Sequence, residues 1–445
     1  MRVAVIGTGH VGLVTAACLA HVGHDVIGMD DDAQKIAKLQ RGHMPIYEPV
    51  LEAIVEGSQA AGRLRFTTDF RAAVRDRQAA FICMTTPPQP NGGADLSAVE
   101  NTTRLIAGAG PPDLLVVEKS TVPANTCAWI ERTLAIYGGA REVEVASNPE
   151  FFREGSAVHD YLHPARVVVG VKSARAADRL RDLYGPILEG RFDCPVHNLC
   201  PRNGGVPFLV TNVQAAELIK HASNAFLASK ISFINAVADV CDRVGADVVQ
   251  VAQGMGLDPR IGPSFLQPGL GFGGSCFTED ARVFLRLAEE MSVDFGLLRE
   301  VDRINRRRID VAAGKLRKAL WGLRAKRVGL LGLAFKPHTD DVRHAPALTL
   351  AARLIEEGAE VVGYDPQARQ AARAAMPTLA IADDPYAVGE GSDGVVLVTE
   401  WPELLSLDWP RLKQRMRRPV ILDGRNALDR EQLLAAGFEY LGIGR

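Results

Sequence analysis

The first thirty residues follow an order of elements that few folds accommodate. Residues 2–6 form a short apolar, β-branched run, as expected for a buried parallel strand. A turn with glycine at its first, third and sixth positions follows over residues 7–12, and apolar residues over 11–22 then recur at helical spacing. A second apolar run over 25–29 ends in Asp30. This order predicts an α/β domain built on a doubly wound parallel sheet.

Each glycine of such a turn has a mechanical reason. Gly7 makes the tight turn, Gly9 lets the backbone approach a pyrophosphate, and Gly12 lets the helix pack on the strand. The helix N-terminus attracts the anion. Asp30 can accept hydrogen bonds from ribose hydroxyls and would repel a 2′-phosphate, so the pattern predicts NAD rather than NADP.

Composition excludes several classes of protein. The chain has 445 residues, 47% of them hydrophobic, which is enough for two or three domains with sizeable cores. A formal net charge of −2 gives no reason to expect a nucleic-acid partner. The basic run over residues 303–308 is interpreted as a solvated helix face. No apolar run reaches the length of a membrane span, and the chain opens directly on a strand rather than on a signal peptide.

The cysteines are odd in number and scattered along the chain. They are Cys18, Cys83, Cys127, Cys194, Cys200, Cys241 and Cys276. Their spacing resembles neither a disulfide framework nor a zinc motif, so we expect reduced thiols, no metal and a cytoplasmic location.

The pattern of elements predicts three domains. Strands and helices alternate over residues 1–199, which predicts the NAD-binding domain. A central helical domain over 200–325 contains a long helix from about 211 to 244, apolar on several faces, which we expect to join two domains and to pair with a second subunit. A second Rossmann-like domain is expected over 326–445, whose first turn lacks the three-glycine pattern and therefore does not predict a second dinucleotide.

Two stretches contain residues that could take part in catalysis. Cys276 follows a Gly-Gly-Ser turn, and a thiol at a helix start has a lowered pKa because of the helix dipole. Asp280 lies one helical turn later. Lys220 and Asn224 lie one turn apart on the long helix. The alternatives are a buried, unreactive cysteine and two solvated side chains on a helix surface.

Several runs together resemble the UDP-glucose/GDP-mannose dehydrogenase family, most closely its members that oxidise UDP-glucose. The resemblance extends over residues 1–430 and is carried by Gly7–Gly12, Val117–Pro123, Ser147–Gly155, Glu217–Asn224, Gly271–Asp280 and Leu331–Arg343. It implies an NAD-dependent, four-electron oxidation of the sugar C6 alcohol to a carboxylate. Cys276 would hold the aldehyde as a thiohemiacetal and then the acyl group as a thioester.

The resemblance also implies roles for individual residues. Lys220 would stabilise negative charge on the C6 oxygen, Asn224 would orient the sugar, and Asp280 would take or relay the alcohol proton. Glu150 would be the general base for thioester hydrolysis. The catalytic set is Cys276, Lys220, Asn224, Asp280, Glu150 and Thr121. The expected cofactor contacts are Gly7, Gly9, Val11, Gly12, Asp30, Lys35, Thr86, Thr121, Glu154 and Arg343.

The expected substrate site draws on all three domains. It comprises Glu150, Phe151, Phe152, Arg153, Glu154, Lys220, Asn224, Arg260, Phe265, Leu266, Gln267, Pro268, Gly269, Gly273, Lys336 and Arg425. Arg260 would serve the substrate of a neighbouring subunit, while Lys336 and Arg425 suit a diphosphate because each donates charge-assisted hydrogen bonds. Glu150 and Glu154 are four residues apart, so on a helix the two carboxylates would lie close enough for one to raise the pKa of the other. The alternative is two solvated carboxylates on a helix surface.

One residue departs from the family pattern. Glu279 occupies a position where the family commonly has a lysine, so the charge beside Cys276 is reversed. Two alternatives remain for the whole chain. It could oxidise another nucleotide sugar, GDP-mannose or a UDP-N-acetylhexosamine, or it could bind nucleotide sugars without catalysis.

Overall fold

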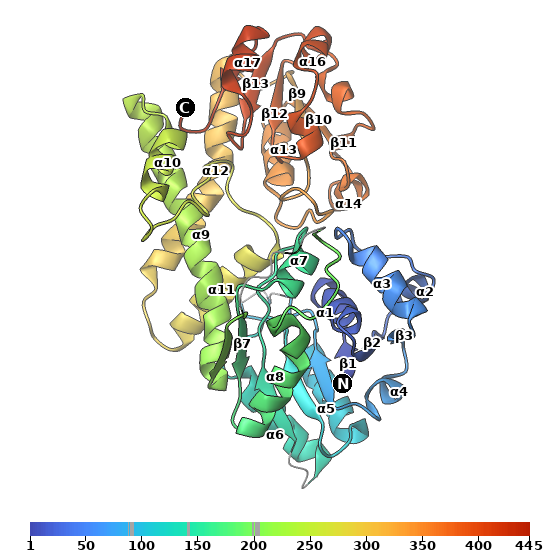
Figure 1. Ribbon diagram of the computed structural model, residues 1–445. Helices are drawn as coiled ribbons and strands as arrows, with labels where there is room; N and C mark the ends of the chain where they lie inside the picture. Colours follow the sequence, from blue (N-terminus) through green and yellow to red (C-terminus); the bar gives the residue numbers. More distant parts are fainter. Residues whose placement is uncertain (88, 90–92, 140–142, 198–199, 201–204) are drawn as a thin grey trace. The chain divides into compact units, whose positions relative to one another are not determined.

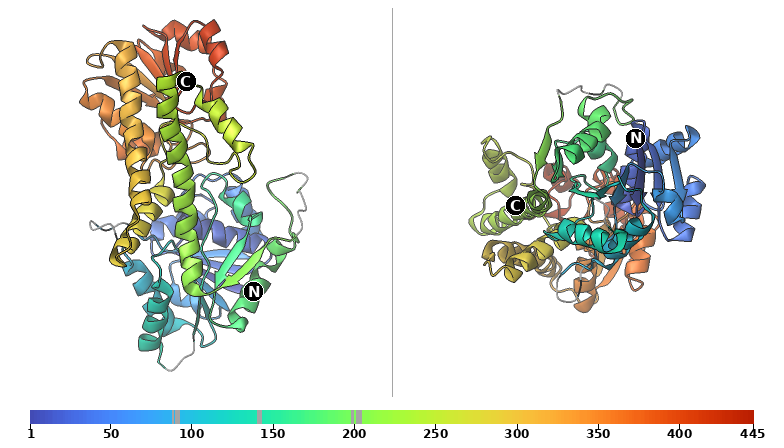
Figure 2. Two further views of the ribbon diagram at one scale, coloured as in Figure 1. Left: turned by 90° about the vertical axis from the view of Figure 1, so that its left-hand side faces the viewer. Right: turned by 90° about the horizontal axis from the view of Figure 1, so that it is seen from below.

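The computed structural model describes residues 1–87, 89, 93–139, 143–197, 200 and 205–445, except for the side chain of Cys276. The chain divides into two compact units, Met1–Ala222 and Ser223–Arg445. Figure 1 shows the elements of each unit in sequence colours. Helix α9 (Val213–Val244) contributes residues to both units and is one uninterrupted helix (Figure 2). The fold class expected from the sequence is confirmed: both units are α/β, with largely parallel sheets.

The first unit is built on an eight-stranded sheet in the order β3-β2-β1-β4-β5-β6-β7-β8. Its strands are β1 (Arg2–Ile6), β2 (Asp25–Met29), β3 (Leu64–Thr67), β4 (Ala79–Ile82), β5 (Leu115–Glu118), β6 (Glu144–Ser147), β7 (Val167–Gly170) and β8 (Phe208–Thr211). Its helices are α1 (His10–His21), α2 (Ala33–Gln40), α3 (Leu51–Ala60), α4 (Phe70–Val74), α5 (Ser97–Ala109), α6 (Thr126–Gly138), α7 (Ala157–Leu162) and α8 (Ala174–Leu188).

Helices cover both faces of this sheet, which explains why its inner strands are apolar at nearly every position. In β1, Val3 and Val5 belong to one core cluster together with residues of α1, α3, α7 and α8. Ala4 and Ile6 belong to a second cluster with residues of α4, α5 and α6. Successive side chains of a strand point to opposite faces, so a strand buried on both sides needs a continuous apolar run.

The sequence predicted a parallel sheet, and one strand pair departs from that prediction. The pair β6–β7 is antiparallel, with Ser147 opposite Gly170, while β7 and β8 are parallel to each other. An apolar run looks the same whichever way the strand points, so the sequence could not give its direction. Strand β8 was also missed. It lies at the sheet edge with exposed or half-buried residues, and it ends at the residue where the sequence predicted the long helix to begin.

The second unit contains the six-stranded parallel sheet β11-β10-β9-β12-β13-β14. Its strands are β9 (Arg327–Leu331), β10 (Glu360–Tyr364), β11 (Ala380–Ile381), β12 (Gly394–Leu397), β13 (Val420–Asp423) and β14 (Glu439–Leu441). Its other elements are α10 (Val248–Gly256), α11 (Ser275–Glu290), α12 (Gly296–Leu320), α13 (Pro346–Glu356), α14 (Arg369–Ala375), η1 (Pro385–Gly389), α15 (Pro402–Leu405), α16 (Trp409–Arg415) and α17 (Arg430–Ala435). Among the described residues, no helix is both long and apolar enough to cross a bilayer.

The basic run on α12 is only partly the solvated face that the sequence predicted. Arg303 and Arg306 are exposed and pair with acidic residues of their own helix. Arg308 is instead buried, and its guanidinium donates to Asp239 on α9 at 2.6 Å and to the carbonyl of Gly269. A buried arginine with these partners joins α9, α12 and the loop before α11.

Candidate active site

The glycines of the first turn differ in what constrains them. Gly7 has φ of 92°, and a Cβ there would lie 2.4 Å from the carbonyl oxygen of Cys83. A Cβ on Gly12 would lie 1.8 Å from the carbonyl oxygen of Gly7. Within the part of the chain that the structure describes, a Cβ on Gly9 would meet nothing within 4 Å, and no side chain caps the start of α1. The protein itself therefore fixes Gly7 and Gly12, while the open space at Gly9 and the uncapped helix fit a pyrophosphate.

Asp30 is buried at the end of β2 and is held from several sides. Its Oδ2 accepts hydrogen bonds from the Thr8 backbone and hydroxyl and from Lys35 Nζ at 2.8 Å. Burial acts to raise the pKa of Asp30, but the hydrogen bonds from Lys35 and Thr8 hold that pKa below its usual value. Oδ1 accepts the amide of Asp32 and retains a lone pair that could accept a ribose hydroxyl. Lys35 and Asp30, both expected cofactor contacts, thus lie together.

The corresponding aspartate of the second unit has no oxygen left to accept a hydrogen bond from a ribose hydroxyl. Asp365 follows β10, and its Oδ2 accepts the amides of Leu333 and Ala334 and the indole N–H of Trp401. Its Oδ1 accepts the amides of Gln367 and Ala368. The protein therefore supplies the hydrogen bonds that a ribose could otherwise make at this position.

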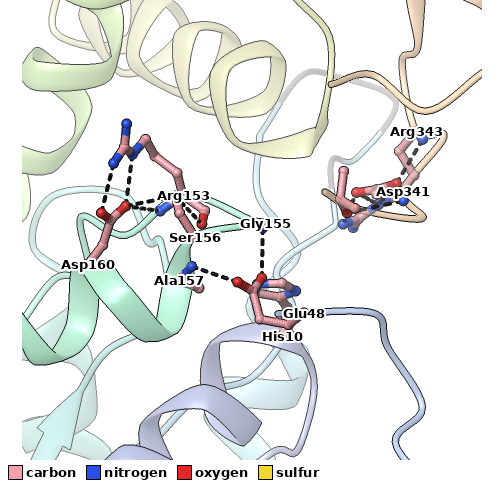
Figure 3. Close-up of polar contacts among 10 residues, drawn as sticks. His10, Glu48, Arg153, Gly155, Ser156, Ala157, Asp160, Asp341 and Arg343 are labelled. Atoms are coloured by element: carbon pink, nitrogen blue, oxygen red, sulfur yellow. Dashed lines mark hydrogen bonds and ion pairs between the residues drawn. The ribbon is translucent and has the colours of Figure 1, made fainter. Parts of the chain in front are cut away.

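A buried carboxylate ties the start of α1 to the loop before α7. Glu48 accepts the amides of Gly155 at 2.7 Å and Ala157 at 2.8 Å, and its Oε2 lies 3.1 Å from His10 Nε2 (Figure 3). Burial acts to lower the pKa of His10, but the Glu48 carboxylate and the nearby charges of Glu154 and Glu150 raise it overall. A protonated His10 at the first position of α1 would add positive charge where the turn is shaped for phosphate.

Glu150 and Lys220 form a buried ion pair in the first unit. The two charged atoms are 2.5 Å apart, and the side chains are 3% and 5% exposed. Glu150 Oε2 is buried and accepts no hydrogen bond from the described residues. Residues 148–153 form no helix, so the expected helical pairing of Glu150 with Glu154 is wrong. The partner of Glu150 is a lysine, and its second oxygen is left to accept a bond from water or a ligand.

The first turns of α9 are fastened to the loop that contains Thr121. Glu217 accepts the amides of Asn125 and Cys127 at 2.7 and 2.9 Å. His221 Nε2 lies 2.7 Å from the carbonyl oxygen of Val122. These contacts flank Lys220 on both sides and fix its position. Neither Glu217 nor His221 was among the expected functional residues, because their partners are about ninety residues away in sequence.

The same loop brings two expected cofactor contacts together. The Thr86 hydroxyl donates to the carbonyl oxygen of Thr121 at 2.8 Å. The rest of the Pro- and Gly-rich loop over 86–93 lies partly outside the described residues, at 88 and 90–92.

In the second unit, Asn224 and Asp280 are in direct contact. Asn224 Nδ2 donates to Asp280 Oδ2 at 2.5 Å, and both side chains are buried. Helix α11 begins at Ser275, so Cys276 is its second residue and Asp280 follows one turn later, as the sequence predicted. The side chain of Cys276 lies outside the described residues. Among the described side chains, none caps α11, so no capping residue of this part of the chain satisfies its first amides.

The loop before α11 is glycine-rich because the protein itself packs tightly against it. A Cβ on Gly273 would lie 2.4 Å from the carbonyl oxygen of His344, and one on Gly274 would lie 2.8 Å from the Phe335 ring. Asn305 also holds this loop, because it bonds both the amide and the carbonyl of Phe272. Close packing within the second unit therefore accounts for these glycines.

Arg425 also holds the loop before α11 through hydrogen bonds. Its guanidinium donates to the carbonyl oxygens of Val398, Gly271 and Phe335, at 2.6, 3.0 and 3.3 Å. Three of its five N–H groups are therefore used by backbone carbonyls, which leaves at most two for the diphosphate that the resemblance implies.

The other expected substrate residues differ in exposure. Arg153 is exposed and forms a two-pronged ion pair with Asp160 (Figure 3), and Arg260 is exposed and pairs with Asp258. Phe151 lies beneath Arg166, while Phe152 lies near the rings of His10 and Tyr161. In the segment 265–269, the residues Leu266, Pro268 and Gly269 are buried, Gln267 is exposed, and Phe265 adopts φ of 64° beside the Phe277 ring.

Glu279 lies in a mixed charge environment. Its Oε1 is 3.8 Å from His344 Nε2. Partial burial raises the pKa of Glu279, while the nearby charge of Arg343 acts to lower it and that of Asp280 to raise it. Arg343 forms an ion pair with Asp341 at 2.6 Å (Figure 3), and Lys336 lies over the Phe335 ring.

Three family models match the chain in order. They describe the NAD-binding domain, the central domain and the UDP-binding domain of the UDP-glucose/GDP-mannose dehydrogenase family, over residues 1–188, 214–307 and 329–430. The chain belongs to this family. It is therefore an NAD-dependent nucleotide-sugar dehydrogenase, as the sequence predicted, and its second Rossmann-like region corresponds to the family's UDP-binding domain.

Similar proteins cover the full length of the chain. UDP-glucose 6-dehydrogenases of Rhizobium meliloti and Pseudomonas aeruginosa are each 40% identical, over 100% of this chain and 100% and 98% of their own. A UDP-glucose dehydrogenase from Pyrobaculum islandicum superposes with a TM-score of 0.89 at 38% identity, covering 100% of this chain and 97% of that one. A UDP-D-ManNAc dehydrogenase from Pyrococcus horikoshii gives 0.86 at 30% identity, covering 100% and 99%.

Glu118, at the end of β5, gives a test of the electrostatics of the first unit. Burial raises the pKa of Glu118 from 4.5 to about 8. The folded protein therefore keeps this proton up to about pH 8, whereas the unfolded chain releases it near 4.5. The free energy of unfolding should fall between these pH values, by an amount on the order of a few kcal/mol. Glu118→Gln removes the titration, so urea denaturation should show a smaller loss of stability from pH 5 to pH 9.

The exposed residue Glu56 of α3 provides the control. Glu56→Gln should leave the difference between the two pH values as in the wild type. An equal loss of stability in Glu118→Gln and wild type would mean that Glu118 is ionised in the folded protein at pH 5.

Proposed function

We propose that this dehydrogenase oxidises UDP-glucose at C6 to UDP-glucuronate. The full-length relatives at 40% identity that are named UDP-glucose 6-dehydrogenase support this substrate. The observation that carries the chemistry is the buried Glu150–Lys220 pair, whose second carboxylate oxygen accepts no bond from the described residues. The three-domain division, 1–199, 200–325 and 326–445, is part of the proposal and agrees with the order of the family models.

The first oxidation needs a base for the alcohol proton and a positive charge near C6. When bound by the turn Gly7–Gly12 and Asp30, NAD would supply the hydride acceptor for each of the two oxidations. Asp280, fixed by Asn224, takes or relays the C6 hydroxyl proton, and Lys220 stabilises the oxygen as it becomes negative. Asn224 follows Lys220 by four residues on α9, so these two groups are one helical turn apart.

Cys276 then makes the second oxidation possible. Its thiolate adds to the aldehyde carbon to give a thiohemiacetal. With a second NAD as the hydride acceptor, this adduct would become a thioester that stays bound to Cys276. Glu150 takes a proton from water, the hydroxide adds to the thioester carbonyl, and the C–S bond breaks to return the thiolate. Overall, one alcohol, one water and two NAD⁺ give one carboxylate, two NADH and three protons.

The residues that we expect to bind ligands fall into two groups, one for NAD and one for the nucleotide sugar. We assign NAD to the turn Gly7–Gly12 with Asp30, Lys35, Thr86 and Thr121, and also to Glu154 and Arg343. We assign the nucleotide sugar to Phe151, Phe152, Arg153, the segment 265–269, Gly273, Lys336 and Arg425. The remaining lone pair on Asp30 Oδ1 and its negative charge support NAD over NADP.

A panel of nucleotide sugars tests the substrate and the stoichiometry together. UDP-glucose should give the highest kcat/KM and two NADH per sugar, because the aldehyde stays bound to Cys276 until it is oxidised again. GDP-mannose, UDP-N-acetylglucosamine and UDP-N-acetylmannosamine should be poor substrates. NADH absorbance and chromatography of the product measure both quantities.

Variants of Cys276 are the matched controls. Cys276→Ala should bind UDP-glucose and NAD but form no UDP-glucuronate, while Cys276→Ser should be slowed by orders of magnitude. Preference for another sugar would assign a different substrate to the same chemistry. Release of one NADH and free aldehyde by the wild type would exclude the thioester route, and no turnover of any sugar would favour a binding protein.

Glu279 should weaken NAD binding because a carboxylate replaces the family's lysine. A lost charge-assisted hydrogen bond to phosphate costs about 1.5–3 kcal/mol, or roughly ten-fold or more in affinity. We expect the KM for NAD to be highest in the wild type, lower in Glu279→Gln and lowest in Glu279→Lys, with little change in kcat. Steady-state kinetics at low ionic strength measure this, since salt screens the effect. Equal KM values for the three proteins would mean that Glu279 does not act on the cofactor.

We also propose that α9 pairs with a second copy of the chain. Phe226, Phe233 and Val240 recur every seven residues along it and are 66, 56 and 58% exposed. Residues seven apart lie on nearly the same face of a helix, so they form an apolar stripe suited to a partner helix. A homodimer would cover this stripe, and the exposed Arg260 would serve the neighbouring subunit's substrate.

Phe233→Glu should convert the dimer to a monomer, because it places two like charges in an apolar interface. Sedimentation velocity measures the mass in solution. Trp129→Glu is the control, since Trp129 is an exposed aromatic residue on α6 rather than on α9. An unchanged mass for Phe233→Glu, or a monomeric wild type, would contradict the pairing through α9.

A further inference from the structure

Two cysteines and two histidines gather at the end of α7, and none of them is among the residues assigned to catalysis. Cys194, His197 and Cys200 come from one short segment, and His163 is the C-cap residue of α7. One potential ligand atom from each residue lies within 4.8 Å of all the others. All four side chains are partly buried rather than fully exposed.

The distances between these atoms match the edges of a tetrahedral zinc site. Zn–S bonds of about 2.3 Å and Zn–N bonds of about 2.0–2.1 Å place sulfur and nitrogen roughly 3.6 Å apart across a tetrahedron. Cys194 Sγ lies 3.2 Å from His163 Nε2 and 3.5 Å from His197 Nδ1. Cys200 Sγ lies 3.6 Å from His163 Nε2. These three distances therefore fit the edges of a tetrahedral zinc site, and every distance among the four ligand atoms is within 4.8 Å.

We propose that His163, Cys194, His197 and Cys200 bind a structural zinc ion. Two thiolates and two imidazoles are a common ligand set for Zn²⁺, and they leave it with no net charge. Four protein ligands fill the tetrahedron and leave no position for a substrate or a reactive water. The ion therefore stabilises the fold and takes no part in the oxidation of the sugar.

The position of the site explains what the ion would stabilise. Residues 189–207 join α8 to β8, and their described part forms no helix or strand. Connections of this length without regular structure are uncommon in compact domains. Phe192 and Val196 pack against the core of the first unit, and the Asp193 carbonyl oxygen lies 2.6 Å from His21 Nε2. A zinc ion bound to His163 would fasten the segment to α7.

The sequence predicted no metal because the ligands do not follow a familiar zinc pattern. The spacing Cys194-x₂-His197-x₂-Cys200 contains no Cys-x₂-Cys pair, and the fourth ligand lies 31 residues before Cys194. Cys194 and Cys200 are both in the thiol form in the structure, so a disulfide between them is the competing arrangement.

Metal analysis of the purified full chain tests the proposal. Protein produced in zinc-supplemented medium should contain about one zinc per chain. The variants Cys194→Ser and His163→Gln should contain at least about ten-fold less, and their Tm should fall. Replacement by Co²⁺ should give the thiolate-to-metal charge-transfer absorption of a tetrahedral site, and Cys194→Ser should weaken it.

Three variants distinguish this site from zinc bound elsewhere on the chain. Cys276→Ala should keep its zinc, which excludes binding at the nucleophile, and so should His159→Gln, whose ring is 5.4 Å from that of His163 but is not among the four ligands. His197→Cys should also keep zinc, since three cysteines and one histidine suit it. Zinc-free wild type, a Cys194–Cys200 disulfide in mass spectrometry, or equal zinc in wild type and Cys194→Ser would each overturn the proposal.

Discussion

The buried ion pair of Lys220 and Glu150 is the interaction on which the first unit's site depends. Two charges removed from water attract each other strongly only if their geometry is fixed, and breaking such a pair costs about 3–5 kcal/mol. Here, buried side chains on both sides of the pair fix its geometry. Glu217 and His221 fasten α9 around Lys220, while Glu48 holds the amides of Gly155 and Ala157 in the loop that follows Glu150. The same contacts that stabilise the fold therefore keep one carboxylate oxygen of Glu150 in place.

Two glycine-rich turns that look alike in the sequence differ in physical origin. At the first turn, Gly9 faces open space while Gly7 and Gly12 are constrained by the backbone, which is the arrangement that a bound phosphate requires. At the turn before α11, backbone and side chains of the same unit press on Gly273 and Gly274. The first turn is shaped for a ligand, and the second is shaped to hold the start of α11, and with it Cys276, in a fixed position.

Sequence patterns predicted the elements better than the contacts between them. The range of β10 was predicted correctly, and α9 begins two residues later than expected, because hydrophobic periodicity reports local burial directly. The direction of β7 could not be predicted, since an apolar run looks the same in a parallel and in an antiparallel strand. Nor could the carbonyl contacts of Arg425, which span up to 154 residues, or the burial of Arg308 within a run of basic residues. Such contacts depend on which segments the fold brings together.

Helix α9 adds a constraint that no single contact supplies. Lys220 and Asn224 belong to different compact units, yet they are four residues apart on one helix. Four residues of α-helix advance by about 6 Å, and the stretch from His221 to Ser223 contains neither proline nor glycine that would bend it. Their spacing therefore stays constant as long as α9 is intact. In the reaction that we propose, Lys220 acts on the C6 oxygen and Asp280, held by Asn224, acts on its proton. Both oxidations would then need a constant spacing between Lys220 and Asn224, and an unbroken helix provides that spacing without a dedicated contact.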